Sequence, residues 1–206
     1  MQKFNKKDGK DSLLHDIEYT SSNCSYMQKR LNRWDVHTKI YIIEYSLFSI
    51  FLSIAPKYIP ISGNILGGIE FLSSAVSIVI LVVSLYVTLA NYQKRAENAL
   101  LILNKLKKMK KDVSSISDED FSAKKYNKYS KRYYRVVRYM EVRDDLDFYR
   151  TCITLPSDEH PHMFTRSQKI YYKLSILIGF CFRVGIILIP IMFSGYLIYL
   201  YIMHFF

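Results

Sequence analysis

Two long runs of the sequence contain no charged side chain. One extends from Phe71 to Gln93 and the other from Val184 to Phe206, and each is 23 residues long. An α-helix needs about 20 apolar residues to cross the hydrocarbon core of a bilayer. Both runs therefore predict membrane-spanning helices, and an ordinary soluble enzyme domain is excluded.

The sequence predicts three spans, so the fold class is an all-α membrane protein. The first span covers about residues 40–59 and the second about 65–90, and the turn between them makes the pair a tight hairpin. The third span lies within a carboxyl-terminal helix over residues 174–206. Residues 1–29 are expected to be a polar tail without a cleavable signal peptide, because no apolar run lies next to the amino terminus.

Basic residues are distributed unevenly between the spans. Lys and Arg number 8 in residues 1–39 and 19 in residues 91–173, whereas the hairpin turn carries only Lys57. Because basic residues flank the cytoplasmic ends of membrane helices, we expect an inner (cytoplasmic) membrane protein with its amino terminus and central region inside and its carboxyl terminus outside. The formal net charge of +11 then reflects topology and attraction to the lipid bilayer. No direct nucleic-acid contact is expected, because acids are interleaved with the basic residues.

The polar region between the second and third spans is predicted to be helical. Apolar residues recur there at three- and four-residue spacing, which predicts helices over about 92–111 and 121–149. Ser117 and Asp120 fit a capping box for the second helix. Two such helices joined by a short break form a cytoplasmic helical hairpin, and residues 151–173 are interpreted as a linker.

Signals for an enzyme are weak. The sequence contains no Gly-rich phosphate loop and no clear Ser, His and Asp arrangement, and the three cysteines share no metal-binding spacing. His160 and His162 fit a solvated loop better than a metal site. The acidic residues between Glu141 and Asp147 are interpreted as ion-paired with nearby arginines. We therefore expect no catalytic residues, no cofactor and no metal.

The second span carries most of its small and polar residues on one face, with Gly68, Ser73 and Tyr86 as exceptions. The residues on this face follow a heptad pattern that traces a single stripe along the helix. This polar stripe consists of Gly63, Gly67, Glu70, Ser74, Ser77, Leu81, Ser84 and Thr88.

Two interpretations of the polar stripe remain open. Small residues and hydroxyls allow helices to pack closely in a membrane. The same face suits the wall of a water-filled pore in an oligomer, and Glu70 favours this reading because an ionisable residue inside a span usually faces a cavity or a partner. Glu44 and Arg183 lie near the inner ends of their spans and are expected to form an intramembrane charge pair.

The order of these segments resembles the SLATT domain, the two-transmembrane effector domain associated with SMODS nucleotidyltransferases and SLOG sensors. The resemblance covers residues 30–150. Glu141 and Leu146-Asp147 fit a family motif of an acid, Asn and His followed by Ile-Asp, whereas Val142 and Arg143 stand where Asn and His are usual. The segments that carry the resemblance are Arg30-Leu31-Asn32-Arg33, Arg95-Ala96-Glu97 and Tyr139 to Phe148.

The resemblance implies a function in prokaryotic conflict systems. It implies a homo-oligomeric membrane effector that forms an ion-conducting pore, or disrupts the membrane, when a partner or nucleotide signal triggers it, so that growth stops or the cell dies. It also implies an operon-encoded partner, which would be a nucleotidyltransferase, a nucleotide sensor or a reverse transcriptase. The alternative is a non-conducting membrane anchor or scaffold that recruits a cytoplasmic partner.

Overall fold

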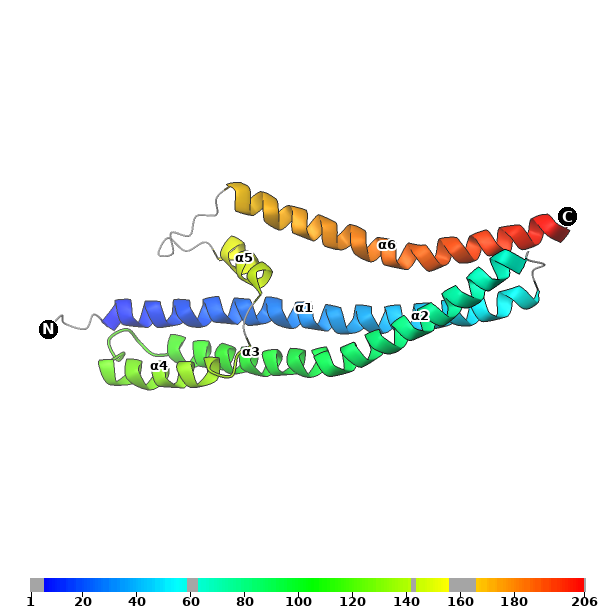
Figure 1. Cartoon of the computed structure of the whole chain (residues 1–206). Coiled ribbons are helices and arrows are strands. Elements are labelled where there is room, and N and C mark those ends of the chain that lie inside the picture. The colour runs from blue at the N-terminus through cyan, green and yellow to red at the C-terminus, as the bar shows by residue number, and fades with distance from the viewer. Residues whose placement is uncertain (1–5, 59–62, 142–143, 156–165, 206) are drawn as a thin grey trace. The chain divides into compact units, whose positions relative to one another are not determined.

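A computed structural model describes residues 6–58, 63–141, 144–155 and 166–205 of the chain. Every element in these ranges is helical, which confirms the all-α prediction (Figure 1). The elements are α1 (Lys6–Ile54), the short 3-10 helix η1 (Ala55–Lys57), α2 (Gly63–Ala90), α3 (Tyr92–Ser114), α4 (Ala123–Val137), α5 (Asp145–Thr154) and α6 (Arg166–Phe205).

Three helices are long and apolar enough to cross a membrane, which matches the three spans predicted from the sequence. They are α1, the helix that begins with α2, and α6.

Pro190 lies inside α6, which continues on both sides of it. Asn91, between α2 and α3, has a φ of 49°, a left-handed conformation that Asn tolerates better than most residues. The hairpin turn lies largely outside the described residues.

The chain divides into two compact units. Unit 1 contains residues 1–33 and 92–164, and unit 2 contains residues 34–91 and 165–206. Helix α1 contributes its first part to unit 1 and its second part to unit 2. Each unit has its own buried apolar residues, which form two clusters in the described part of unit 1 and one in that of unit 2.

Unit 1 is a helical domain built on the first part of α1. Six buried residues of this part are spaced alternately three and four apart, so they form one face against α3 and α4. They are Leu13, Ile17, Thr20, Cys24, Met27 and Leu31. Leu106, Met109 and Phe121 belong to the larger cluster, and all three are fully buried. Figure 1 shows α3 and α4 side by side along this part of α1.

This packing differs from the sequence expectation in two respects. The segment 1–29 is helical from Lys6 onward and forms one wall of the unit 1 core, rather than a simple tail. The helix expected over 121–149 is divided into α4 and α5, and α5 continues to Thr154. Ser122 caps α4 by accepting a hydrogen bond from the Lys125 backbone N–H, whereas Ser117 and Asp120 bond to each other within the preceding loop.

Unit 2 contains the second part of α1 with α2 and α6. Phe48 and Leu52 of α1 are buried in a cluster that Ile69 of α2 and Leu197 of α6 complete. Phe48 also meets Phe193 of α6 edge-on, with ring centroids 5.8 Å apart. Helix α1 therefore packs against both other helices of this unit.

Candidate functional site

The polar stripe of α2 lies mostly on a free surface of unit 2. Helix α2 is continuous, so the heptad spacing keeps the residues of the stripe on one face. Glu70 and Leu81 are exposed, and Leu81 retains 61% of its accessible surface. Gly67, Ser74 and Thr88 are also exposed. Gly63 begins the helix, but its surroundings lie outside the described residues.

Gly67 is not a close-packing glycine within the protomer. A Cβ placed on it meets no atom within 4 Å, apart from the neighbours in its own helix. The packing interpretation of the stripe needs small residues where backbones approach closely. Gly67 therefore does not serve that purpose between the helices of one chain.

Four serines join α1 to α2, and only one of them belongs to the polar stripe. Ser49 and Ser77 hydroxyl oxygens lie 2.8 Å apart, and those of Ser53 and Ser73 are also 2.8 Å apart. Ser73 is buried, whereas Ser77 is exposed at the edge of the contact. Sequence reasoning missed these pairs, although both helices carry serines four residues apart, which is the signal of a shared face.

The face of α2 that packs on α1 is distinct from the polar stripe. Ile69, Ser73 and Val76 lie on the packed face. At 100° per residue, the centre of the stripe is rotated from this face by about a quarter turn. Ser77 and the half-buried Ser84 lie where the two faces meet. One edge of the stripe therefore takes part in the hairpin contact, and the rest is left free.

The ionisable residues inside the spans make few contacts. Within the described part of the chain, the Glu70 carboxylate has no hydrogen bond or ion pair. Arg183 Nε donates to the Gly179 carbonyl oxygen in its own helix at 2.8 Å. Glu44 is half-buried, and the described residues contain no ion pair between it and Arg183. The pairing of Glu44 with Arg183 stays a prediction.

Asp147, from the family motif, is held by an arginine that is distant in sequence. Arg30 Nε on α1 lies 2.9 Å from Asp147 Oδ2 on α5, and Arg30 Nη1 lies 3.7 Å from Asp144 Oδ2. The Asp147 side chain is 1% exposed, and its Oδ1 has no hydrogen-bond partner among the described residues. Burial raises the pKa of Asp147 above its ordinary value, and the nearby Arg30 guanidinium only partly offsets that effect.

Glu141 is paired in the same way with Arg95 of α3. Its Oε1 lies 2.7 Å from Arg95 Nη2, and both side chains remain partly exposed. Leu146 is half-buried at the start of α5. Asp147 and Glu141 are therefore ion-paired, and their partners Arg30 and Arg95 come from α1 and α3, distant in sequence. These two ion pairs join the three sequence segments that carry the family resemblance.

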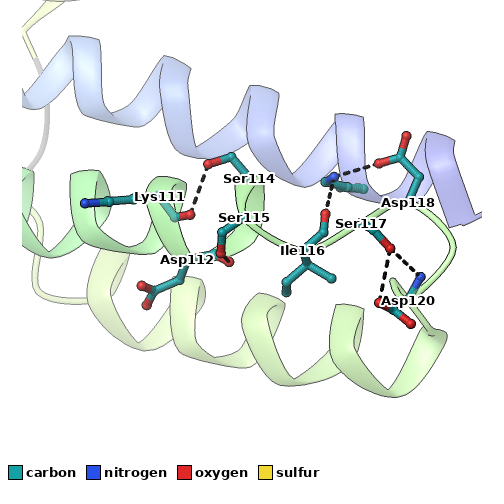
Figure 2. Close-up of polar contacts among 9 residues, drawn as sticks. Lys111, Asp112, Ser114, Ser115, Ile116, Ser117, Asp118 and Asp120 are labelled. Carbon is teal, nitrogen blue, oxygen red and sulfur yellow. Dashed lines mark hydrogen bonds and ion pairs between the residues drawn. The ribbon is translucent and has the colours of Figure 1, made fainter.

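The loop between α3 and α4 is fixed to α1 by a lysine. Lys10 Nζ donates to the Ile116 carbonyl oxygen and to Asp118 Oδ1, both at 2.6 Å. The hydrogen bond from Lys10 lowers the pKa of the exposed Asp118 carboxyl. Figure 2 shows how Ser114, Ser115 and Ser117 close the rest of this loop with short-range hydrogen bonds. The loop is thus an ordered part of unit 1.

Nothing in the described residues resembles a metal centre, since no group of three His, Cys, Asp or Glu side chains is placed to hold an ion. Cys24 is fully buried, and burial raises the pKa of its thiol to about 11. Its Sγ lies 3.3 Å from Met140 Sδ, a core contact. Cys24 is therefore a packing residue with an unreactive thiol.

A comparison with protein families identifies the family of this chain. The model of the SMODS and SLOG-associating 2TM effector domain family 5 matches residues 6–196. The chain belongs to the SLATT family. SLATT domains are two-transmembrane effector domains associated with conflict systems. Comparison with curated proteins and with solved structures gave no match.

The SLATT match is longer than the resemblance seen in the sequence. It begins at the first turn of α1 and ends within α6, instead of covering only residues 30–150. The amino-terminal half of α1 and most of the third membrane-crossing helix are therefore part of this SLATT protein's family pattern.

Proposed function

We propose that this SLATT protein is the membrane effector of a prokaryotic antiphage system. It assembles into a homo-oligomer that conducts ions, or disrupts the membrane, when an operon-encoded partner or a nucleotide signal triggers it. The resulting loss of membrane potential stops growth or kills the infected cell. Membership in an effector family and the helical membrane architecture support this proposal.

The exposed carboxylate of Glu70 carries the argument for a pore. A charged side chain inside a bilayer costs about 3 kcal/mol even by the lower estimates, so such residues usually face a cavity or a partner. Glu70, Ser74 and Thr88 lie on the part of α2 that packs on neither α1 nor α6. Other copies of the chain would surround this face with water or polar groups. Three spans are too few to enclose a channel in one protomer, which also favours an oligomer.

The packing of unit 1 supports the proposed orientation. Residues of α1 before the first span share one core with α3 and α4, which follow the second span. Segments that share a core lie on the same side of a membrane, as a two-span hairpin requires. The many basic residues of these segments favour the cytoplasmic side. The hairpin turn and the carboxyl terminus would then face outward.

Membrane potential in cells tests this proposal directly. Leu81 is the one bulky apolar residue of the polar stripe, so a ring of its copies would close the path by dewetting. Leu81→Ser should make the pore leak without a trigger, and a potential-sensitive dye should report depolarisation on induction. Val79→Leu, an exposed apolar change off the stripe, is the control and should leave the potential unchanged. A silent Leu81→Ser variant at equal membrane abundance would favour the scaffold function.

A further inference from the structure

Helix α4 of unit 1 carries a row of basic side chains along one face. The basic residues at i, i+4, i+7, i+11 and i+14 share one helix face. All five are exposed, and residues 121–140 contain no acid. This cation row consists of Lys124, Lys128, Lys131, Arg135 and, at the C-cap, Arg138.

The face of α4 opposite the cation row is already occupied. Tyr126, Tyr129, Tyr133 and Val136 pack against the unit 1 core. The Tyr133 hydroxyl also forms a hydrogen bond with the Thr20 hydroxyl of α1, and the two oxygens lie 2.7 Å apart. An interfacial membrane helix needs a free apolar face to enter the lipid headgroup region, and α4 has none to offer. The cation row must therefore attract its partner through charge at a water-exposed surface.

The side chains of the cation row form no hydrogen bond or ion pair in the part of the chain that the structure describes. Arg132, which lies beside the row, is different because it pairs with Asp112 of α3 at 3.1 Å. The row extends for about 21 Å with one cation roughly every 5 Å, which suits a linear array of phosphates.

Two exposed tyrosines flank the cation row. Tyr134 is 65% exposed and Tyr139 is 76% exposed. Exposed aromatic rings next to basic side chains provide stacking platforms for unpaired bases, and Arg side chains add cation–π contacts. A duplex hides its base faces, whereas a single strand presents both phosphates and bases to such a surface.

We propose that the cation row of α4 and Tyr134 bind single-stranded nucleic acid, without sequence preference. This departs from the sequence-based expectation of no nucleic-acid contact. That expectation counted acids and bases along the whole central region, whereas the folded helix segregates them. Asp118 and Glu141 are paired with Lys10 and Arg95, and Asp112 is paired with Arg132 beside the row rather than with a member of it. The proposal is independent of ion conduction.

Binding of a labelled strand to the full chain tests the proposal. The chain is placed in nanodiscs of neutral lipid, and the anisotropy of a fluorescent 20-nucleotide oligouridine is measured over a range of salt concentrations. The triple variant Lys128→Gln, Lys131→Gln and Arg135→Gln should weaken binding at least tenfold. It should also reduce the salt slope by about 2, since a single strand contributes about 0.7 per phosphate contact. Tyr134→Ala should weaken binding, whereas Tyr134→Phe should not.

The matched control removes the same charge from α3. Lys105, Lys107 and Lys111 are exposed cations on that helix, and their change to Gln should leave affinity within twofold. Equal losses in the two triple variants would mean non-specific attraction and would overturn the proposal, as would the absence of any binding. Membrane docking is a separate outcome: a dye on Asn127→Cys that shifts in anionic but not neutral nanodiscs, with no response to oligouridine, would also overturn it.

Discussion

Arg30 Nε of α1 donates a hydrogen bond to Asp147 Oδ2 of α5 across 2.9 Å, joining residues 117 positions apart in the sequence. The Asp147 side chain is almost fully buried, whereas the Arg30 side chain is 22% exposed. Removing one member of a buried pair leaves the other without its counter-charge. The two members should therefore contribute unequally to the packing of α5 on α1.

Replacing Arg30 should destabilise unit 1 more than replacing Asp147. Arg30→Met leaves a buried carboxylate and should lower the free energy of unfolding by about 2–3 kcal/mol. Asp147→Asn should cost less, because Asp144 remains 3.7 Å from Arg30 and supplies a counter-charge. Denaturant unfolding of the full chain in detergent measures both. Lys94→Met, at an exposed site on α3, is the control, and a cost for it equal to that of Arg30→Met would contradict the prediction.

Asp147 and Asp118 should influence stability with opposite dependence on pH. The folded state raises the pKa of Asp147, so the stability of the wild type relative to Asp147→Asn should fall as pH rises above about 4. The folded state lowers the pKa of Asp118, so its contribution is present above about pH 4 and is lost on acidification. Unfolding of the wild type, Asp147→Asn and Asp118→Asn between pH 3 and 7 checks the two signs. Parallel pH profiles would refute the assignment.

Ser73 should matter more to the hairpin than its neighbour Ser74. Ser73→Ala removes the contact with the Ser53 hydroxyl and should cost about 1 kcal/mol, the usual value for a hydrogen bond between membrane helices. Ser74 is exposed, and within the described residues its hydroxyl bonds only to the Glu70 carbonyl oxygen in its own helix, so Ser74→Ala should be close to neutral. Unfolding in mixed micelles ranks the two variants. A larger cost for Ser74→Ala than for Ser73→Ala would contradict the assignment of Ser73 to the face of α2 that packs on α1.

Single cysteines in a cysteine-free background should report the membrane orientation. Lys57→Cys, in the short helix after α1, should react with an impermeant maleimide added to intact cells. Ser114→Cys, at the end of α3, should react only after the membrane is permeabilised. The uneven distribution of basic residues is the reason for this expectation. If only Ser114→Cys were labelled in intact cells, the orientation would be the reverse of the one proposed.

The spans and α3 could be predicted from local sequence because each depends on a continuous pattern. Uncharged runs longer than the membrane core predicted the second and third spans, and a shorter apolar segment predicted the first. Three- and four-residue spacing gave α3, which ends within a few residues of the expected position. The same spacing from Leu13 to Leu31 could have revealed the buried face of α1, but frequent polar residues between its apolar positions made this segment look like a tail.

The contacts between distant segments could not be derived from local spacing. Local reasoning paired Asp147 with arginines one turn away on the same helix, whereas the fold supplies Arg30 from α1. The division between α4 and α5 has no Pro or Gly to mark it, and only the fold shows that Asp144 precedes a new helix. The polar stripe was visible from its spacing, but its separation from the face that packs on α1 depends on where α1 lies.

The central claim is that the polar stripe lines a conducting path with Glu70 near one mouth. Planar-bilayer recordings of the purified chain under a salt gradient test it most directly, with Glu97→Gln on α3 as the control for an exposed acid outside the spans. A ring of carboxylates favours cations, so the wild type and Glu97→Gln should show the same cation-selective reversal potential. Glu70→Gln should assemble normally and show a reversal potential shifted toward zero. An unchanged reversal potential in Glu70→Gln would contradict the claim.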